Sequence, residues 1–254
     1  MESTRTRRLK MMRIMAESEP ILGKPWTEPF TDMEFAWVPG GTFEMGDMFG
    51  DGEFREKPLH TVYLDGFWLG KYPVTQTQWE RVIGSNPSYF QGPDNPVECV
   101  SWVDVQEFIQ RLNGRKSIAN FRMLTEAEWE YACRSGGKPE KYSGGGNLDS
   151  VAWYKGNSGG KTHPVGEKLP NALGIHDMSG NVWEWVSDWY GSDYYAKSPR
   201  NNPQGPTAGS SRVYRGGSWR YSTRACRATY RGNLTPGGWN YAIGFRLALS
   251  PGQQ

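Results

Sequence analysis

The chain has 254 residues, of which 22% are charged, and its formal net charge is +2 at pH 7. This length suffices for one large domain or two small ones, and the near balance of charge gives no argument for a nucleic-acid partner. Residues 1–34 start basic but contain no apolar run of signal-peptide length, and no later run reaches membrane-spanning length. We therefore expect an N-terminal extension over 1–34, no membrane span and a cytoplasmic location.

Reactive residue types are few and scattered. The three histidines lie far apart without an HExxH motif, so each is expected to be structural. The sequence contains no phosphate-binding loop, no nucleophile elbow and no dinucleotide fingerprint. The cysteines are too few and too widely spaced for a disulfide framework or a CxxC metal pair, and we expect free thiols at Cys99, Cys133 and Cys226.

The first part of the chain is expected to form short strands. Residues 35–38 and 42–46 have the pattern of strands on either side of a Pro-Gly-Gly turn. Residues 60–64 and 67–70 flank Asp65-Gly66, a strong turn pair, which predicts a hairpin. The acidic loop between these pairs has irregularly spaced carboxylates and is expected to be solvated.

Capping signals indicate three helices. Thr75 is a predicted N-cap for residues 76–83, and a second helix is expected to start near Ser101. Thr125 and Glu128 have the spacing of a capping box at the start of a third helix that ends near Cys133. Short helices among many short strands and long loops indicate an irregular α+β domain rather than a parallel βαβ array.

The stretch 177–184 is the best metal candidate. Asp177 and Glu184 bracket a tight turn whose backbone carbonyls can point inward, and hard oxygen ligands of this kind suit Ca²⁺. The alternative is that both carboxylates cap turns or pair with arginines.

The segment 212–248 begins and ends with strand-like runs, and glycine, arginine, tyrosine, tryptophan, serine, threonine and asparagine dominate between them. Large aromatic side chains and arginine are enriched where proteins bind partners. An ordinary irregular segment with internal aromatic packing would have the same composition, so the residue types alone leave both interpretations open.

Six stretches in order resemble the formylglycine-generating-enzyme, or sulfatase-modifying-factor, family: residues 37–47, 67–84, 124–136, 180–185, 215–219 and 243–248. The resemblance covers nearly the whole chain and implies an irregular C-type-lectin-like α+β domain over 35–250 with little regular secondary structure. It also implies a structural Ca²⁺ bound by Asp177, Gly180, Val182 and Glu184. Asp177 and Glu184 would bind through their carboxylates, and Gly180 and Val182 through their backbone carbonyl groups.

Catalytic members of that family bind Cu(I) through two thiolates placed shortly after the Gly-Gly-Ser motif. This chain has Tyr221 and Cys226 in that region, so the pair is absent. A phenol is a poor substitute for a soft thiolate ligand. We therefore expect no copper, no catalytic residues and no formylglycine synthesis. The alternative is an oxidase of the same family with a rearranged metal site.

The segment also resembles that of variable proteins diversified by retroelements, which rewrite a binding face on this fold. The expected partner is an unknown protein or surface ligand, and a non-variable member with the same segment is the alternative. The predicted contact residues are the non-framework positions: Arg220, Tyr221, Ser222, Thr223, Thr229, Tyr230, Gly232, Asn233, Gly237, Gly238, Trp239, Asn240 and Tyr241.

Overall fold

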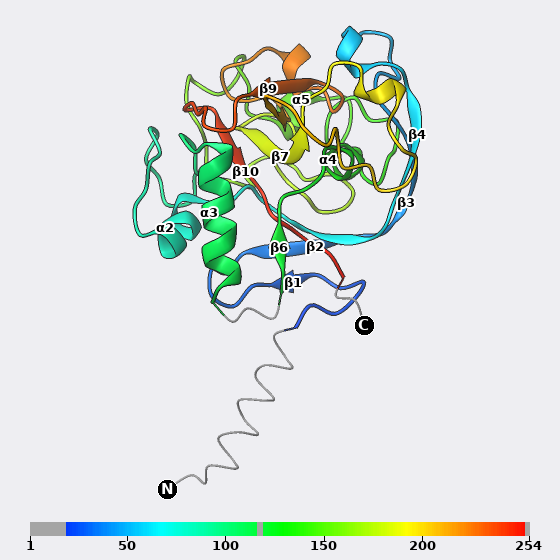
Figure 1. Cartoon of the computed structure of the whole chain (residues 1–254). Helices are drawn as coiled ribbons and strands as arrows, with labels where there is room; N and C mark the ends of the chain where they lie inside the picture. Colours follow the sequence, from blue (N-terminus) through cyan, green and yellow to red (C-terminus); the bar gives the residue numbers. More distant parts are fainter. Residues whose placement is uncertain (1–18, 116–118, 252–254) are drawn as a thin grey trace, which may run out of the picture.

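The computed structural model describes residues 19–115 and 119–251, which fold into three sheets and a few short helices (Figure 1). The first sheet has the order β1 (Trp26–Thr27), β2 (Glu34–Val38), β5 (Phe67–Gly70), β11 (Ala248–Leu249) and β6 (Phe121–Arg122). The second has the order β10 (Ile243–Phe245), β7 (Trp183–Trp189), β8 (Arg212–Arg215) and β9 (Arg231–Leu234). The third pairs β3 (Gly41–Met45) with β4 (His60–Leu64).

Three of the helices begin where the capping signals predicted them, whereas the last, short α-helix and the 3-10 helices were not predicted. The α-helices are α2 (Gln76–Ile83), α3 (Trp102–Asn113), α4 (Glu126–Cys133) and the short α5 (Leu148–Val151). The 3-10 helices are η1 (Phe54–Glu56), η2 (Tyr194–Ala196) and η3 (Thr223–Cys226). Thr75, Ser101 and Thr125 each close a capping box at the start of a helix, so these three predictions are confirmed. No helix in the described ranges is long and apolar enough to cross a bilayer.

The predicted hairpin around Asp65-Gly66 is wrong. Strand β4 pairs with β3, whereas β5 pairs with β2, so the chain changes sheets at this turn. A second corner at Gly40 packs directly against the first, because a Cβ there would lie 2.7 Å from the Leu64 carbonyl oxygen. A local turn signal does not specify which strands pair on either side of it.

The domain starts earlier than the predicted boundary at residue 35. Strand β1 pairs with β2, and the Trp26 ring packs 5.5 Å from Phe35 in the apolar core. Glu28 and Thr31 are also buried, linked by hydrogen bonds from the backbone and side chain of Thr31. Residues 1–18 of the predicted extension lie outside the described residues.

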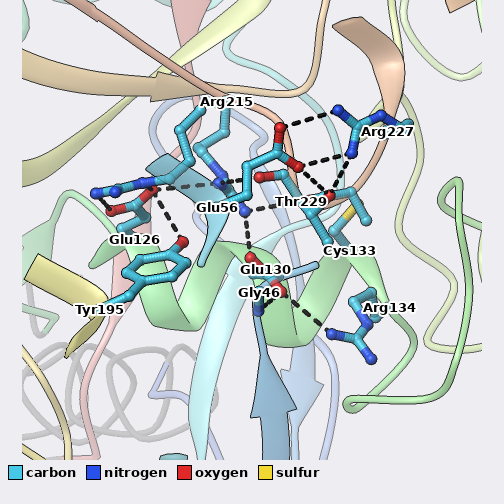
Figure 2. Close-up of polar contacts among 12 residues, drawn as sticks. Gly46, Glu56, Glu126, Glu130, Cys133, Arg134, Tyr195, Arg215, Arg227 and Thr229 are labelled. Atoms are coloured by element: carbon cyan, nitrogen blue, oxygen red, sulfur yellow. Dashed lines mark hydrogen bonds and ion pairs between the residues drawn. The ribbon is translucent and has the colours of Figure 1, made fainter. Parts of the chain in front are cut away.

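A buried network of ion pairs fills the space between α4, η1 and the second sheet (Figure 2). Arg215 donates to Glu126 at 3.2 Å and to Glu130 at 2.5 Å, and Arg231 binds both oxygens of Glu126 at 2.6 and 2.7 Å. Arg134 completes this cluster with a 3.1 Å contact to Glu130. Burial opposes the ionisation of Glu126, but Arg231 and Arg215 outweigh it and hold the pKa of this carboxyl below its ordinary value.

Two further buried pairs extend the same pattern. Arg227 binds Glu56 of η1 at 2.6 and 2.9 Å, and Arg246 binds Glu184 of β7 at 2.7 and 2.8 Å. Four arginines of the segment 212–248 thus pair with glutamates from earlier parts of the chain, and each of these four is at most 2% exposed. The network fastens the C-terminal segment to the rest of the domain.

Replacing Glu126 with glutamine should strongly destabilise the protein, because Arg215 and Arg231 would share a buried site with too little negative charge. We expect the free energy of unfolding, measured by urea denaturation, to fall by about 3–5 kcal/mol. The matched control is Glu107→Gln, which breaks an exposed helical pair with Arg111 and should cost no more than about 0.5 kcal/mol. Equal losses in the two variants would contradict a structural role for the buried network.

Candidate functional site

The segment 212–248 alternates between buried anchoring residues, which we call the pins, and exposed loops. The pins are the four paired arginines described above, together with Trp219, which is 9% exposed. Between the pins, residues 220–224 are all exposed and residues 235–241 are exposed or half-buried. Strand β9 of this segment lies at the opposite end of the molecule from β1, β2 and β6 (Figure 1). The exposed loops therefore form one end of the domain, which we call the loop face.

Most predicted contact residues are accessible at the loop face. The exposed members are Arg220, Tyr221, Ser222, Thr223, Gly237 and Trp239. The half-buried members are Tyr230, Asn233, Gly238, Asn240 and Tyr241. The solvent-facing rings with the largest exposure among them are Trp239 at 60% and Tyr221 at 41%.

Two predicted contact residues are buried instead, and this part of the prediction is wrong. Thr229 is 3% exposed; its hydroxyl donates to Glu56 at 2.6 Å and accepts from Arg227 at 2.9 Å. Gly232 is buried in β9, where a Cβ would lie 1.9 Å from the ring of Tyr214. Thr229 thus belongs to the ion-pair network, and Gly232 provides room for a neighbouring ring.

An aromatic cluster supports the centre of the loop face. The buried ring of Trp183 lies 4.9 Å from Tyr214, 5.3 Å from Tyr221 and 5.7 Å from Tyr230. Arg55 of η1 donates a 2.9 Å hydrogen bond to the Tyr230 hydroxyl. Tyr230 is therefore partly a framework residue, whereas Tyr221 packs on the cluster with one edge and faces solvent with the rest.

A second aromatic group includes a residue that the sequence did not single out. The Tyr241 ring lies 5.7 Å from Trp219 and 5.7 Å from Tyr89, and Tyr89 is 70% exposed. Tyr89 belongs to the loop between α2 and α3, and its neighbour Phe90 packs edge-on against Trp219 at 5.2 Å. The adjacent tyrosine and phenylalanine in a polar Pro/Asn/Gly loop were the available sequence signal.

The one thiol within the segment 212–248 is inaccessible. Cys226 is fully buried against Leu148, Val151 and Ala152, and all three cysteines are free. Burial raises the pKa of the Cys226 thiol to about 12, so the group is protonated at neutral pH. A protonated, buried thiol is neither a good nucleophile nor a good soft-metal ligand.

The predicted calcium residues lie together, but only one carboxylate has a free oxygen. Asp177 is 2% exposed; one of its oxygens accepts from the Gly166 amide at 2.7 Å, and the other has no partner among the described residues. Burial raises the pKa of Asp177 to about 6, and the nearby carboxylate of Glu184 adds to the rise. An orphaned acidic oxygen of this kind fits a bound cation.

The other half of the predicted calcium set is already engaged. Glu184 accepts from Arg246 through both oxygens and from the Trp129 indole at 2.7 Å. Gly180 has φ +84°, and a Cβ there would lie 2.3 Å from the Trp153 carbonyl oxygen, so the turn requires glycine. Within residues 19–115 and 119–251, no three His, Cys, Asp or Glu side chains gather as a metal-binding group.

Comparison of the chain with known proteins points to one family. The model of the sulfatase-modifying factor enzyme 1-like domain matches residues 25–251. Chaperone protein LppX of Paenibacillus barcinonensis is 33% identical over 84% of this chain and 88% of its own length. The formylglycine-generating enzyme of Streptomyces coelicolor is 30% identical over 83% of this chain and 87% of its own length.

Among solved structures, Treponema denticola variable protein 1 superposes with a TM-score of 0.80 and 32% identity, covering 90% of this chain and 99% of that one. The chain therefore belongs to the sulfatase-modifying-factor, or formylglycine-generating-enzyme, family and has that family's C-type-lectin-like fold.

Proposed function

We propose that the chain is a non-catalytic binding protein whose loop face holds a protein or surface ligand. The observation that carries this proposal is the division of one segment into buried arginine pins and exposed aromatic loops. Rigid aromatic anchors surrounded by small polar residues are the composition of efficient binding surfaces. The similarity to a protein named a variable protein supports the same reading.

Whether the loop face is diversified is a question for the coding DNA. Asparagine codons mutated at adenine reach the tyrosine, serine, threonine and glycine codons that the exposed positions of the segment use. A template repeat and a reverse-transcriptase gene beside the coding region would establish diversification, and their absence would mark a non-variable member with the same binding face.

Replacing Tyr221 and Trp239 with alanine should abolish binding with little effect on stability, because both rings are largely outside the core. The measurement is binding to clones selected on the unaltered protein from a displayed library of protein fragments, together with thermal unfolding. The matched control is Tyr63→Ala, on β4, where the ring is 39% exposed and lies outside the loop face. Binding that survives both replacements, or a large fall in melting temperature, would contradict the proposal.

The alternative function is an oxidase, which the name of the Streptomyces coelicolor relative favours. The burial and protonation of Cys226 support the binding function instead. We expect no oxygen consumption when the protein is supplied with copper, a reductant and a cysteine-containing peptide. Oxygen consumption that Cys226→Ser removes would establish the oxidase and overturn the non-catalytic proposal.

We further propose that Ca²⁺ binds beside Asp177, because the orphaned oxygen of this buried carboxylate would gain a partner. Added calcium should raise the melting temperature of the protein, and Asp177→Asn should remove that increase. The control is Asp193→Asn, which alters an exposed pair with Lys197 and should keep the increase. Identical responses to calcium in both variants would exclude a calcium site at Asp177.

A further inference from the structure

Arg220 is an exposed cation at the loop face that lies against aromatic rings. Its guanidinium carbon lies 4.8 Å from the centroid of the Tyr241 ring and 5.9 Å from those of Trp219 and Tyr221. Among the described residues no carboxylate forms an ion pair with it, in contrast to Arg215 and Arg227 of the same segment. Its charge is therefore available to a partner.

The rings below Arg220 form a fixed platform. The Trp219 indole donates a 3.1 Å hydrogen bond to the Tyr241 carbonyl, and the two rings lie 5.7 Å apart. Phe90 packs edge-on against Trp219, and Tyr89 packs against Tyr241. An arginine that already rests on such rings loses less side-chain freedom when it pairs than an arginine free in solvent.

Two further exposed cations lie in or beside the loop 220–224. Arg224 has a side chain that is 62% exposed, and Lys155 is an exposed residue whose amide binds the Tyr221 carbonyl at 3.0 Å. Glu53, the neighbouring carboxylate, already pairs with Arg55 at 2.6 Å and with Arg224 at 3.1 Å. A surface of this sign attracts acidic partners and disfavours basic ones.

Building on the proposed binding function, we propose that the partner presents an acidic peptide segment to this platform. A carboxylate of that segment pairs with both arms of the Arg220 guanidinium, and an adjacent aromatic or aliphatic side chain packs on Tyr89 and Tyr241. The geometry favours a carboxylate because the planar guanidinium fork matches it with two parallel hydrogen bonds. Tyr89 thereby extends the binding surface beyond the segment 212–248.

A phage library of random 12-residue peptides, selected on the full chain, tests this proposal. We expect enrichment of peptides in which aspartate or glutamate stands next to an aromatic or aliphatic residue. The best peptide, made synthetically, should bind at least about tenfold more weakly to Arg220→Gln and to Tyr89→Ala. Replacing its acidic residues with the matching amides should cause a similar loss with the unaltered protein.

The control variant is Arg200→Gln. Arg200 is also an exposed arginine without an ion pair among the described residues, but it lies beside Tyr63 of β4 rather than on the platform. The Arg200→Gln variant should bind the peptide as tightly as the unaltered protein does. Thermal unfolding of Arg220→Gln should match that of the unaltered protein, because the replaced side chain is exposed.

The outcomes separate this proposal from the binding function on which it rests. Peptides without acidic enrichment that still require Tyr221 and Trp239 would overturn the acidic ligand and leave the loop face as the binding surface. Peptides that bind all these variants equally would overturn both. A selection that enriches nothing, or an oligonucleotide that displaces the peptide at equal concentration, would overturn an acidic peptide as the ligand.

Discussion

The pairing of buried arginines with buried glutamates is the constraint on which this structure depends. A guanidinium group removed from water is costly unless a carboxylate meets it with good geometry. Arg215, Arg227, Arg231 and Arg246 each satisfy this requirement with glutamates of α4, η1 or β7. Each pair joins parts of the chain that are far apart in sequence, so together the pairs hold the C-terminal segment against the rest of the domain.

The exposed loops of the segment are held in place because paired, buried arginines flank each of them. Residues 220–224 lie between Arg215 and Arg227, and residues 235–241 lie between Arg231 and Arg246. A loop held at both ends has less conformational freedom to lose when a ligand binds. Among the described residues, the exposed side chains of these loops take no part in the buried ion pairs, so their identity can change without removing one. Rigid ends and replaceable surface residues are the two properties that a binding face needs.

Sequence reasoning succeeded where the signal was local and failed where the answer depended on distant partners. Helix starts at Thr75, Ser101 and Thr125 were predictable because a capping box is complete within four residues. The pairing of β4 with β3 was not predictable from Asp65-Gly66, since that turn fits a hairpin and a sheet corner equally well. Tyr89 was missed for the same reason, because its place beside Tyr241 is set by packing between remote loops.

The arginines of the segment 212–248 therefore fall into two kinds that the sequence alone does not distinguish, exposed surface residues and buried residues paired with glutamate. Arg220 and Arg224 are exposed, as the composition of an interface suggests, whereas Arg215 and Arg231 are buried in the core. The two buried arginines differ from the exposed ones because each pairs with a buried glutamate. The same logic applies to Tyr221. Its ring is 41% exposed and packs 5.3 Å from Trp183, but it carries no hydrogen bond of the ion-pair network. A different side chain at this position therefore alters the exposed surface without removing a buried ion pair.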